Sequence, residues 1–216
     1  MPERSASRLV LVFAKHYAYG AVKTRLAADL GARQARQLYR RLAGRIWRGI
    51  ADPGWQRWLC LEPAKAIAEV ESWLPNADRI QPQVQGDLGE RMAAAFEQGF
   101  QAGFQEIALL GTDAPAIQAP LLRQSFDLLQ QNDAVLVPSL DGGYALMGLS
   151  KPCPDLFREI DWSTDRVRRQ SLQRAEKAGL QVAETEAVRD LDTIEDLEAF
   201  RREGWAWAQE PTSKSP

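Results

Sequence analysis

Two lysines, an arginine and a glycine share one short stretch near the start of the chain, FAKHYAYGAVKTRL at residues 13–26. Lysine offers a point charge and arginine a two-pronged fork, and both suit phosphate oxygens. Gly20 supplies the backbone freedom that lets a loop fold around an anion. From these residues alone two interpretations stay open. Lys15, Lys23 and Arg25 hold the phosphates of a ligand, or they keep a surface turn solvated.

A second segment with side chains suited to chemistry, here called a loaded segment like the first, is Gly111-Thr-Asp-Ala-Pro115. It follows the apolar run 107–111. A carboxylate at the end of a strand is well placed to bind Mg²⁺, which commonly takes one or two protein carboxylates and completes its shell with substrate phosphates. Asp113 is therefore a candidate metal ligand. The alternative is an aspartate that caps a turn or helix before Pro115.

A third segment, Arg189-Asp-Leu-Asp-Thr-Ile-Glu-Asp196, carries more carboxylates. If Leu191 points into the core, Asp190 and Asp192 share the opposite face of an extended segment. Thr193 is expected to cap the following helix, with Asp196 at its third position. Capping does not explain the two preceding carboxylates, whereas a second metal ligand would.

These segments need a scaffold that brings them together, and the pattern of the chain predicts one. Apolar runs predict strands at 9–14, 55–61, 107–111, 134–138, 144–149 and 180–183. Helical spacing predicts helices at 32–50, 64–74, 87–104, 120–131, 165–178 and 194–203. This alternation predicts an α/β fold with a mainly parallel sheet and helices on both faces. Ligands of such sheets bind beyond the carboxyl ends of the strands, where the loaded segments begin.

The totals fit one α/β domain at residues 1–208, followed by a polar tail at 209–216 that we expect to be disordered. Lys and Arg number 27 against 29 Asp and Glu, so bulk charge indicates neither nucleic acid nor membrane as a partner. The apolar run 9–14 is too short for a signal or membrane segment. Cys60 and Cys153 are isolated, which predicts neither a disulfide nor a zinc site and favours the cytoplasm.

Other conspicuous residues have plainer interpretations. His16 is the single histidine and lacks partners for a metal site, although a substrate contact from its loop stays open. Trp162 lies in a loop just before a helix, an unusual place for a purely structural indole. Six arginines flank an apolar stripe in the 32–50 helix, which favours a solvated face over a nucleic-acid patch: Arg33, Arg36, Arg40, Arg41, Arg45 and Arg48.

Six short motifs follow one another along the chain: AKHYAYGAVKTRL, QGDLGERM, LLGTDAP, PSLDGGYALMGL, IDWST and DLDTIEDL. In that order they resemble a bacterial family of GT-A-fold transferases, often labelled glycosyltransferase-like or arsenosugar-biosynthesis glycosyltransferases. The resemblance covers about residues 9–200. More distantly the chain is similar to the 2-phospho-lactate and molybdenum-cofactor guanylyltransferases. The resemblance implies the GT-A fold, also called the nucleotide-diphospho-sugar transferase fold.

The resemblance also implies roles for the matching positions. Lys15, Gly20, Lys23 and Arg25 would hold nucleotide phosphates, with Lys23 and Asp113 as catalytic residues. Mg²⁺ or Mn²⁺ would bind Asp113 and Asp192, and Asp190 is the alternative second ligand. The loop near the base and ribose would contain Gly86, Asp87 and Leu88. The acceptor or sugar would be bordered by Asp141, Gly142, Gly143, Tyr144, Trp162, Ser163 and Thr164.

Two departures from the family pattern matter. The first motif of the family usually resembles KxPxPGxxKTRL, and here His16-Tyr-Ala-Tyr19 replaces the prolines. Fewer prolines predict a less rigid loop. The usual DxD triplet is reduced to Gly111-Thr112-Asp113, so one carboxylate of that pair remains.

Three functions follow as hypotheses. The first is nucleotidyl transfer from a nucleoside triphosphate to a small phosphorylated acceptor, which the basic KTRL loop favours. The second is glycosyl transfer from a nucleotide-diphospho-sugar, with Asp141 or Asp161 as the base. The third is a catalytically silent nucleotide-binding domain. In the first two cases the partners are a nucleotide or nucleotide-sugar and a small-molecule acceptor.

Overall fold

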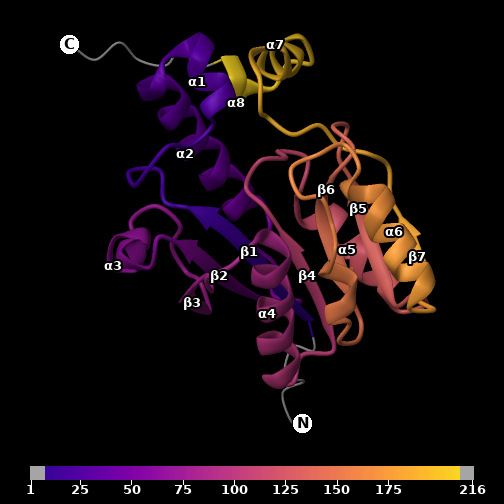
Figure 1. Cartoon of the computed structure of the whole chain (residues 1–216). Helices are drawn as coiled ribbons and strands as arrows, with labels where there is room; N and C mark the ends of the chain where they lie inside the picture. The colour runs from indigo at the N-terminus through magenta and orange to yellow at the C-terminus, as the bar shows by residue number, and fades with distance from the viewer. Residues whose placement is uncertain (1–7, 210–216) are drawn as a thin grey trace.

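Within residues 8–209, which the computed structural model describes, seven strands form one sheet in the order β3-β2-β1-β4-β6-β5-β7 (Figure 1). Strand β6 runs antiparallel to its neighbours β4 and β5, and the other pairs are parallel. The strands are β1 Arg8–Lys15, β2 Gln56–Glu62, β3 Arg79–Pro82, β4 Glu106–Leu110, β5 Ala134–Pro138, β6 Tyr144–Leu149 and β7 Val182–Glu184.

Helices cover both faces of this sheet (Figure 1). The face that carries Val10 and Val12 of β1 packs against α2, α3 and α5, and against α7 and α8 at one end. The opposite face, with Leu9 and Leu11, packs against α4, α6 and the short turn η2. The helical segments are α1 Thr24–Leu30, α2 Ala32–Gly49, η1 Ala64–Ala66, α3 Ile67–Val70, α4 Leu88–Gln101, α5 Ala119–Leu129, η2 Pro154–Phe157, α6 Val167–Lys177, α7 Ile194–Arg202 and α8 Ala206–Gln209.

The central strand shows why the apolar runs are unbroken. Leu9, Val10, Leu11 and Val12 are all fully buried, because successive side chains enter the two opposite cores. The predicted α/β class, the mainly parallel sheet and the helices on both faces are confirmed.

Several short elements differ from the sequence prediction. Strand β3 and helix α1 were not expected, since β3 is a four-residue edge strand and α1 begins within the basic motif. The predicted helix 64–74 is only η1 and α3, after which the chain turns toward β3. Gln209, assigned to the disordered tail, is the last residue of α8, and 210–216 lie outside the described residues. The single domain remains a proposal, which the one continuous sheet supports.

In the part of the chain that the structure describes, no helix is long and apolar enough to cross a membrane.

Candidate functional site

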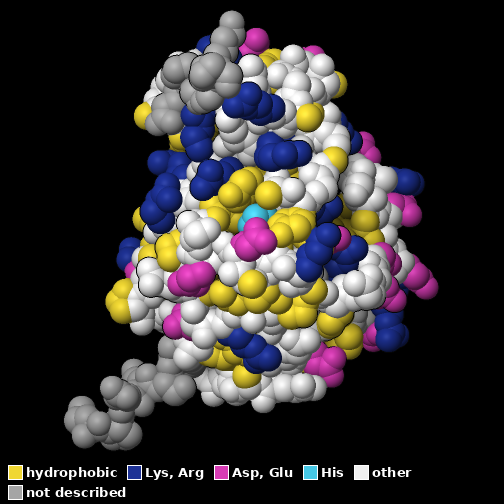
Figure 2. Space-filling model, turned by 90° about the vertical axis from the view of Figure 1, so that its left-hand side faces the viewer, with side chains coloured by type: hydrophobic (Ala, Val, Ile, Leu, Met, Phe, Trp, Pro, Cys, Tyr) yellow, Lys and Arg dark blue, Asp and Glu magenta, His cyan; other side chains and the backbone are white. Residues whose placement is uncertain are grey.

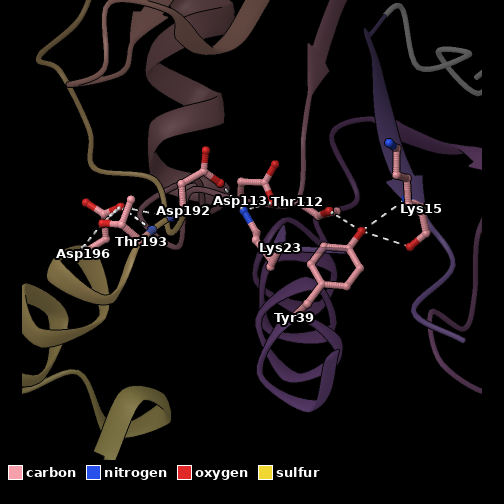
Figure 3. Close-up of polar contacts among 8 residues, drawn as sticks. All are labelled: Lys15, Lys23, Tyr39, Thr112, Asp113, Asp192, Thr193 and Asp196. Atoms are coloured by element: carbon pink, nitrogen blue, oxygen red, sulfur yellow. Dashed lines mark hydrogen bonds and ion pairs between the residues drawn. The ribbon is translucent and has the colours of Figure 1, made fainter. Parts of the chain in front are cut away.

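Lys23 lies between the two carboxylates that the sequence singled out as metal ligands (Figure 3). Its Nζ is 2.6 Å from Asp113 Oδ1 and 2.8 Å from Asp192 Oδ1. The lysine side chain is only 5% exposed, whereas the two carboxylates remain 47% and 40% exposed. Burial by itself lowers the pKa of Lys23, but the two carboxylates outweigh it and raise that pKa above its ordinary value. The ammonium is therefore charged at neutral pH.

Two separate segments position these carboxylates. Asp113 follows β4, and Asp192 precedes α7. The backbone N–H of Leu191 donates to the carbonyl of Asp113 at 2.9 Å, and the Leu191 side chain is fully buried. This burial confirms that Leu191 points into the core. The neighbouring Asp192 carboxylate shares Lys23 with Asp113.

The cap of α7 fixes the same segment from the other side. Thr193 Oγ1 accepts from the Asp196 N–H at 3.3 Å. The Asp196 carboxylate accepts from the N–H of Thr193 at 2.9 Å and from that of Asp192 at 3.0 Å. Burial tends to raise the pKa of Asp196. The hydrogen bonds lower that pKa by more, so it lies below its ordinary value. The predicted capping box is confirmed, and it also orients Asp192.

A buried tyrosine links the first two loaded segments. Tyr39 Oη, from α2, donates to the Lys15 carbonyl at 3.0 Å and accepts from the Lys15 N–H at 3.2 Å. It also lies 3.0 Å from Thr112 Oγ1 (Figure 3). Burial, followed by the charge of Asp113, raises the pKa of Tyr39 to about 12. Tyr39 could not be assigned to the site from the sequence. A tyrosine on the apolar stripe of a helix has the same pattern whether its hydroxyl serves a site or only packs.

A pocket of about 280 Å³ opens beside Asp192. It brings together Arg25, Asp141 and Asp190, which the sequence had assigned to phosphate, acceptor and metal. Burial, and then the charges of Asp141 and Asp192, raise the pKa of Asp190 to about 6. The full lining is Arg25, Leu140, Asp141, Arg189, Asp190, Asp192, Thr193 and Asp196.

Leu140 and Arg189 are additions that the sequence reasoning missed. Leu140 is 57% exposed, which is unusual for a large apolar side chain and supplies an apolar wall. Arg189 pairs with Asp196 at 3.4 Å across the capping box. The sequence offers one indication of a role for Arg189, which is that it lies in the acidic segment directly before Asp190.

The turn between β5 and β6 orients Asp141. Its carboxylate accepts from the Ser139 hydroxyl and from the Gly143 N–H, the latter at 3.0 Å. Gly142 has φ +91°, and a Cβ there would lie 2.3 Å from the Asp165 carbonyl. The two glycines thus have structural roles, while the carboxylate of Asp141 faces the pocket.

Other residues assigned to the acceptor lie on the opposite core. Tyr144 packs with the cluster of α4 and α6, and burial raises its pKa. Trp162 packs against Gly89 at the start of α4, where a Cβ would lie 2.9 Å from the indole Nε1. This packing explains an indole in that loop. Ser163 has a left-handed backbone with φ 64°, and the Thr164 hydroxyl donates to the Asp161 carbonyl at 2.7 Å.

The loop assigned to base and ribose lies next to Trp162. Asp87 caps α4 and accepts from the Glu90 N–H at 2.9 Å, while Glu90 accepts from the Asp87 N–H at 2.8 Å. Gly86 has φ +125°, and a Cβ there would overlap the Glu90 carboxylate at 2.2 Å. Leu88 is 42% exposed. None of Gly86, Asp87 and Leu88 lines the pocket beside Asp192.

The loop that replaces the family prolines is packed by aromatic side chains. The His16 ring stacks on Tyr17 at 4.7 Å between centroids and meets Trp73 edge-on at 5.4 Å. Arg40 lies over the Tyr17 ring, and Tyr19 Oη donates to Glu69 at 2.6 Å. These contacts join the loop to α2 and to the segment around α3.

His16 is only 2% exposed, and burial lowers its pKa, so its imidazole is neutral at pH 7. Figure 2 shows the cyan histidine between hydrophobic side chains, with an acidic side chain directly beside it. Its buried ring is a packing element of the loop. Lys15 and Gly20, at either end of the loop, are exposed, and Gly20 has φ +83°.

The alternative base Asp161 lies apart from the pocket. Its carboxylate pairs with Arg166 at 3.1 Å and accepts from the Gln170 amide at 2.8 Å. Asp141 is therefore the better placed of the two carboxylates.

Comparison with known proteins gives this geometry a context. Residues 46–164 match a family described as an uncharacterized protein conserved in bacteria, DUF2064. A solved structure from Desulfovibrio desulfuricans G20, provisionally named a nucleotide-diphospho-sugar transferase, superposes with a TM-score of 0.88 at 30% identity. That alignment covers 96% of this chain and 92% of the other. Among curated proteins, none matches the chain significantly.

More distant structures share the fold. The inositol-1-phosphate CTP transferase of T. maritima gives a TM-score of 0.53 at 13% identity, covering 96% of this chain and 98% of that one. A CMP:2-keto-3-deoxy-manno-octonic acid synthetase complexed with CTP gives 0.54 at 11% identity, covering 90% and 97%. The resemblance read from the motifs is thereby confirmed. The chain belongs to the bacterial DUF2064 family, and it has the GT-A fold of the nucleotide-diphospho-sugar transferases.

Proposed function

We propose that this protein is a metal-dependent nucleotidyltransferase. A small phosphorylated acceptor attacks the α-phosphate of a nucleoside triphosphate, the new P–O bond forms, and pyrophosphate leaves. The observation that carries the proposal is the convergence of Asp113 and Asp192 on one cation, Lys23 Nζ, at 2.6 and 2.8 Å. The CTP-using proteins of the same fold support this choice of chemistry.

The two carboxylates fit a divalent cation. One oxygen from each already reaches a single positive charge, and both side chains keep an exposed edge. Among residues 8–209 no group of three or more His, Cys, Asp or Glu side chains is spaced to hold a metal. The remaining ligands would therefore be phosphate oxygens and water, as is usual for Mg²⁺. When bound, Mg²⁺ or Mn²⁺ neutralises phosphate charge and supports departure of pyrophosphate.

The side chains around this point have separate tasks. Lys23 and the exposed Arg25 stabilise the charge that grows on the leaving pyrophosphate. Lys15 and the positive-φ backbone at Gly20 border the phosphates from the end of β1. Asp113 and Asp192 hold the metal, with Asp190 beside them in the pocket. Nucleotidyl transfer needs these positive charges more than it needs a protein base.

Glycosyl transfer from a nucleotide-diphospho-sugar is the second candidate, and one observation favours it. Asp141 shares the pocket with Asp192, and its carboxylate is held by Ser139 and Gly143 in a fixed direction. An oriented carboxylate suits a base that takes the proton of an acceptor hydroxyl. The name of the similar structure from Desulfovibrio desulfuricans G20 is in line with a sugar-nucleotide substrate.

Thermal shift with nucleoside triphosphates and nucleotide-sugars, each with and without Mg²⁺ or Mn²⁺, tests the proposal, followed by product analysis. Pyrophosphate release from a triphosphate is the expected result, and nucleoside diphosphate release from a sugar-nucleotide would establish the second candidate instead. Asp113→Asn should abolish the metal-dependent shift. Asp161→Asn is the matched control, because Asp161 lies outside the pocket.

A protein that shifts with nucleotides but releases no product would be a silent nucleotide-binding domain. An Asp113→Asn protein that shifts with metal as the wild type does would refute the metal site.

A further inference from the structure

We propose that Lys23 competes with the divalent metal for Asp113 and Asp192, so that metal enters the site efficiently only together with the nucleotide. This inference rests on the proposed function and adds an order of events to it. Lys23 would then have two alternate partners, the carboxylates in the free protein and the nucleotide phosphates in the complex.

The first step of the argument is that the space between the carboxylates is already taken. Lys23 Nζ is within 2.8 Å of both Asp113 and Asp192, and its side chain is 5% exposed. A metal held by the same two carboxylates would displace the ammonium from both ion pairs. Metal binding to the free protein therefore carries the cost of leaving a largely buried lysine without its counter-charges.

The second step is that the carboxylates need a cation at all times. They come from two segments that the Leu191–Asp113 backbone hydrogen bond holds together, so they cannot drift apart freely. A third carboxyl group, that of Asp190, lines the pocket beside Asp192. Two adjacent carboxylates without a cation repel each other, so Lys23 stabilises the free protein in an arrangement ready for metal.

The third step is the transfer of Lys23 to the nucleotide. The lysine stem is long and its ammonium is a compact charge with three donors, so the head group can change partner while the backbone at the start of α1 stays in place. Phosphates arriving at the exposed Arg25, two residues along α1, offer the ammonium a new counter-charge. The buried ammonium then has a new counter-charge, so metal binding no longer carries the cost of leaving Lys23 unpaired. By linkage, the metal strengthens nucleotide binding by the same factor.

Mn²⁺ titration of the nucleotide-free protein, followed by electron paramagnetic resonance of the free ion, tests this directly. Wild type should bind Mn²⁺ weakly, and Lys23→Gln should bind it at least about fivefold more tightly, the lower end of typical coupling factors. Lys23→Arg keeps a cation between the carboxylates and should restore weak binding. Lys177→Gln is the matched control, since it removes an exposed lysine of α6 that does not line the pocket and should leave Mn²⁺ affinity unchanged.

The double variant Lys23→Gln with Asp113→Asn should lose the gained affinity, which places the ion at the carboxylates. Equal Mn²⁺ affinity of wild type and Lys23→Gln would overturn the inference, as would a gain of equal size in Lys177→Gln. If Lys23→Gln does not fold, Lys23→Met keeps the apolar stem and takes its place in the same comparison.

The two proposals fail separately. Absence of any nucleotide-dependent thermal shift would refute the nucleotidyltransferase and leave the Mn²⁺ comparison to decide the competition. Wild-type protein that binds Mn²⁺ as tightly without nucleotide as Lys23→Gln does would refute the competition alone.

Discussion

The backbone N–H of Leu191 donates to the backbone carbonyl of Asp113 across 2.9 Å, joining the segment after β4 to the segment before α7. These residues are far apart in the chain, yet this single hydrogen bond sets the two candidate metal ligands beside each other. The Leu191 side chain is fully buried in the core that includes α7. The geometry of the site thus depends in part on a buried apolar side chain that does not line the pocket.

Leu191→Ala should therefore affect both stability and the site. Removing a fully buried leucine leaves a cavity, and we expect a loss of about 2–5 kcal/mol in the free energy of unfolding, measured by urea denaturation. The metal-dependent thermal shift should weaken as well, because the Asp192 segment loses its anchor. Leu140→Ala is the matched control: at 57% exposure it should change stability by less than about 0.5 kcal/mol. Equal losses for the two variants would contradict this account.

Tyr39→Phe tests the link between the ends of β1 and β4. The hydroxyl contacts the Lys15 backbone and the Thr112 hydroxyl, and its removal leaves the part-buried backbone groups of Lys15 and the buried Thr112 hydroxyl with fewer partners. We expect a loss of about 1–3 kcal/mol, measured by urea denaturation at pH 7. Tyr17→Phe should be nearly neutral, because the contacts of Tyr17 are made by its ring with His16, Trp73 and Arg40. A neutral Tyr39→Phe would show that the network adds no stability.

The scaffold was largely predictable from the sequence because each central strand is buried on both faces. Such strands appear as unbroken apolar runs, and five of the six predicted strands begin and end within one residue of the observed ones. The sixth, β7, begins at Val182 where 180 was expected. The edge strand β3 escaped prediction, since Gln81 is its buried residue and a polar side chain there breaks the apolar pattern.

The site was predictable in its residue types and less so in its contacts. Order along the chain placed Asp113 and Asp192 beyond strand ends, and both are there. That Lys23 would lie between them was not predictable, because ion pairing across 169 residues depends on the tertiary fold. Likewise, Tyr144 and Trp162 carry no local sign that separates a pocket residue from a core residue. In the fold, both pack against the hydrophobic cluster on the α4 side of the sheet.

Stability should depend on pH through Asp133, which lies at the start of β5. Its carboxylate pairs with Lys151 at 2.6 Å and accepts from the Gln181 N–H at 2.9 Å, and in that order these contacts lower its pKa. A lowered pKa in the folded state adds stability that is present above the ordinary value of about 3.9 and is lost as the pH falls below it. Asp133→Asn should thus cost on the order of 1 kcal/mol at pH 7.

The difference between wild type and Asp133→Asn should shrink as the pH falls from 5 toward 3, as measured by urea denaturation at each pH. Asp155→Asn is the control, because its ion pair with Arg158 is more than 70% exposed on both sides and should contribute almost nothing. A cost that stays constant over the whole pH range would mean that the charge of Asp133 is irrelevant.

Gly142→Ala separates backbone strain from close packing in the turn that orients Asp141. Gly142 and Gly103 have nearly the same φ, +91° and +93°, so alanine costs about 1–2 kcal/mol at either position. Only at Gly142 would the new Cβ meet backbone, at 2.3 Å from the Asp165 carbonyl, so this variant should lose clearly more stability in urea than Gly103→Ala. The shift needed to relieve that overlap moves the turn that holds the Asp141 carboxylate. Gly142→Ala should therefore also reduce turnover, whereas Gly103→Ala should leave it unchanged, and equal effects of the two variants on both measurements would refute the role of the close approach.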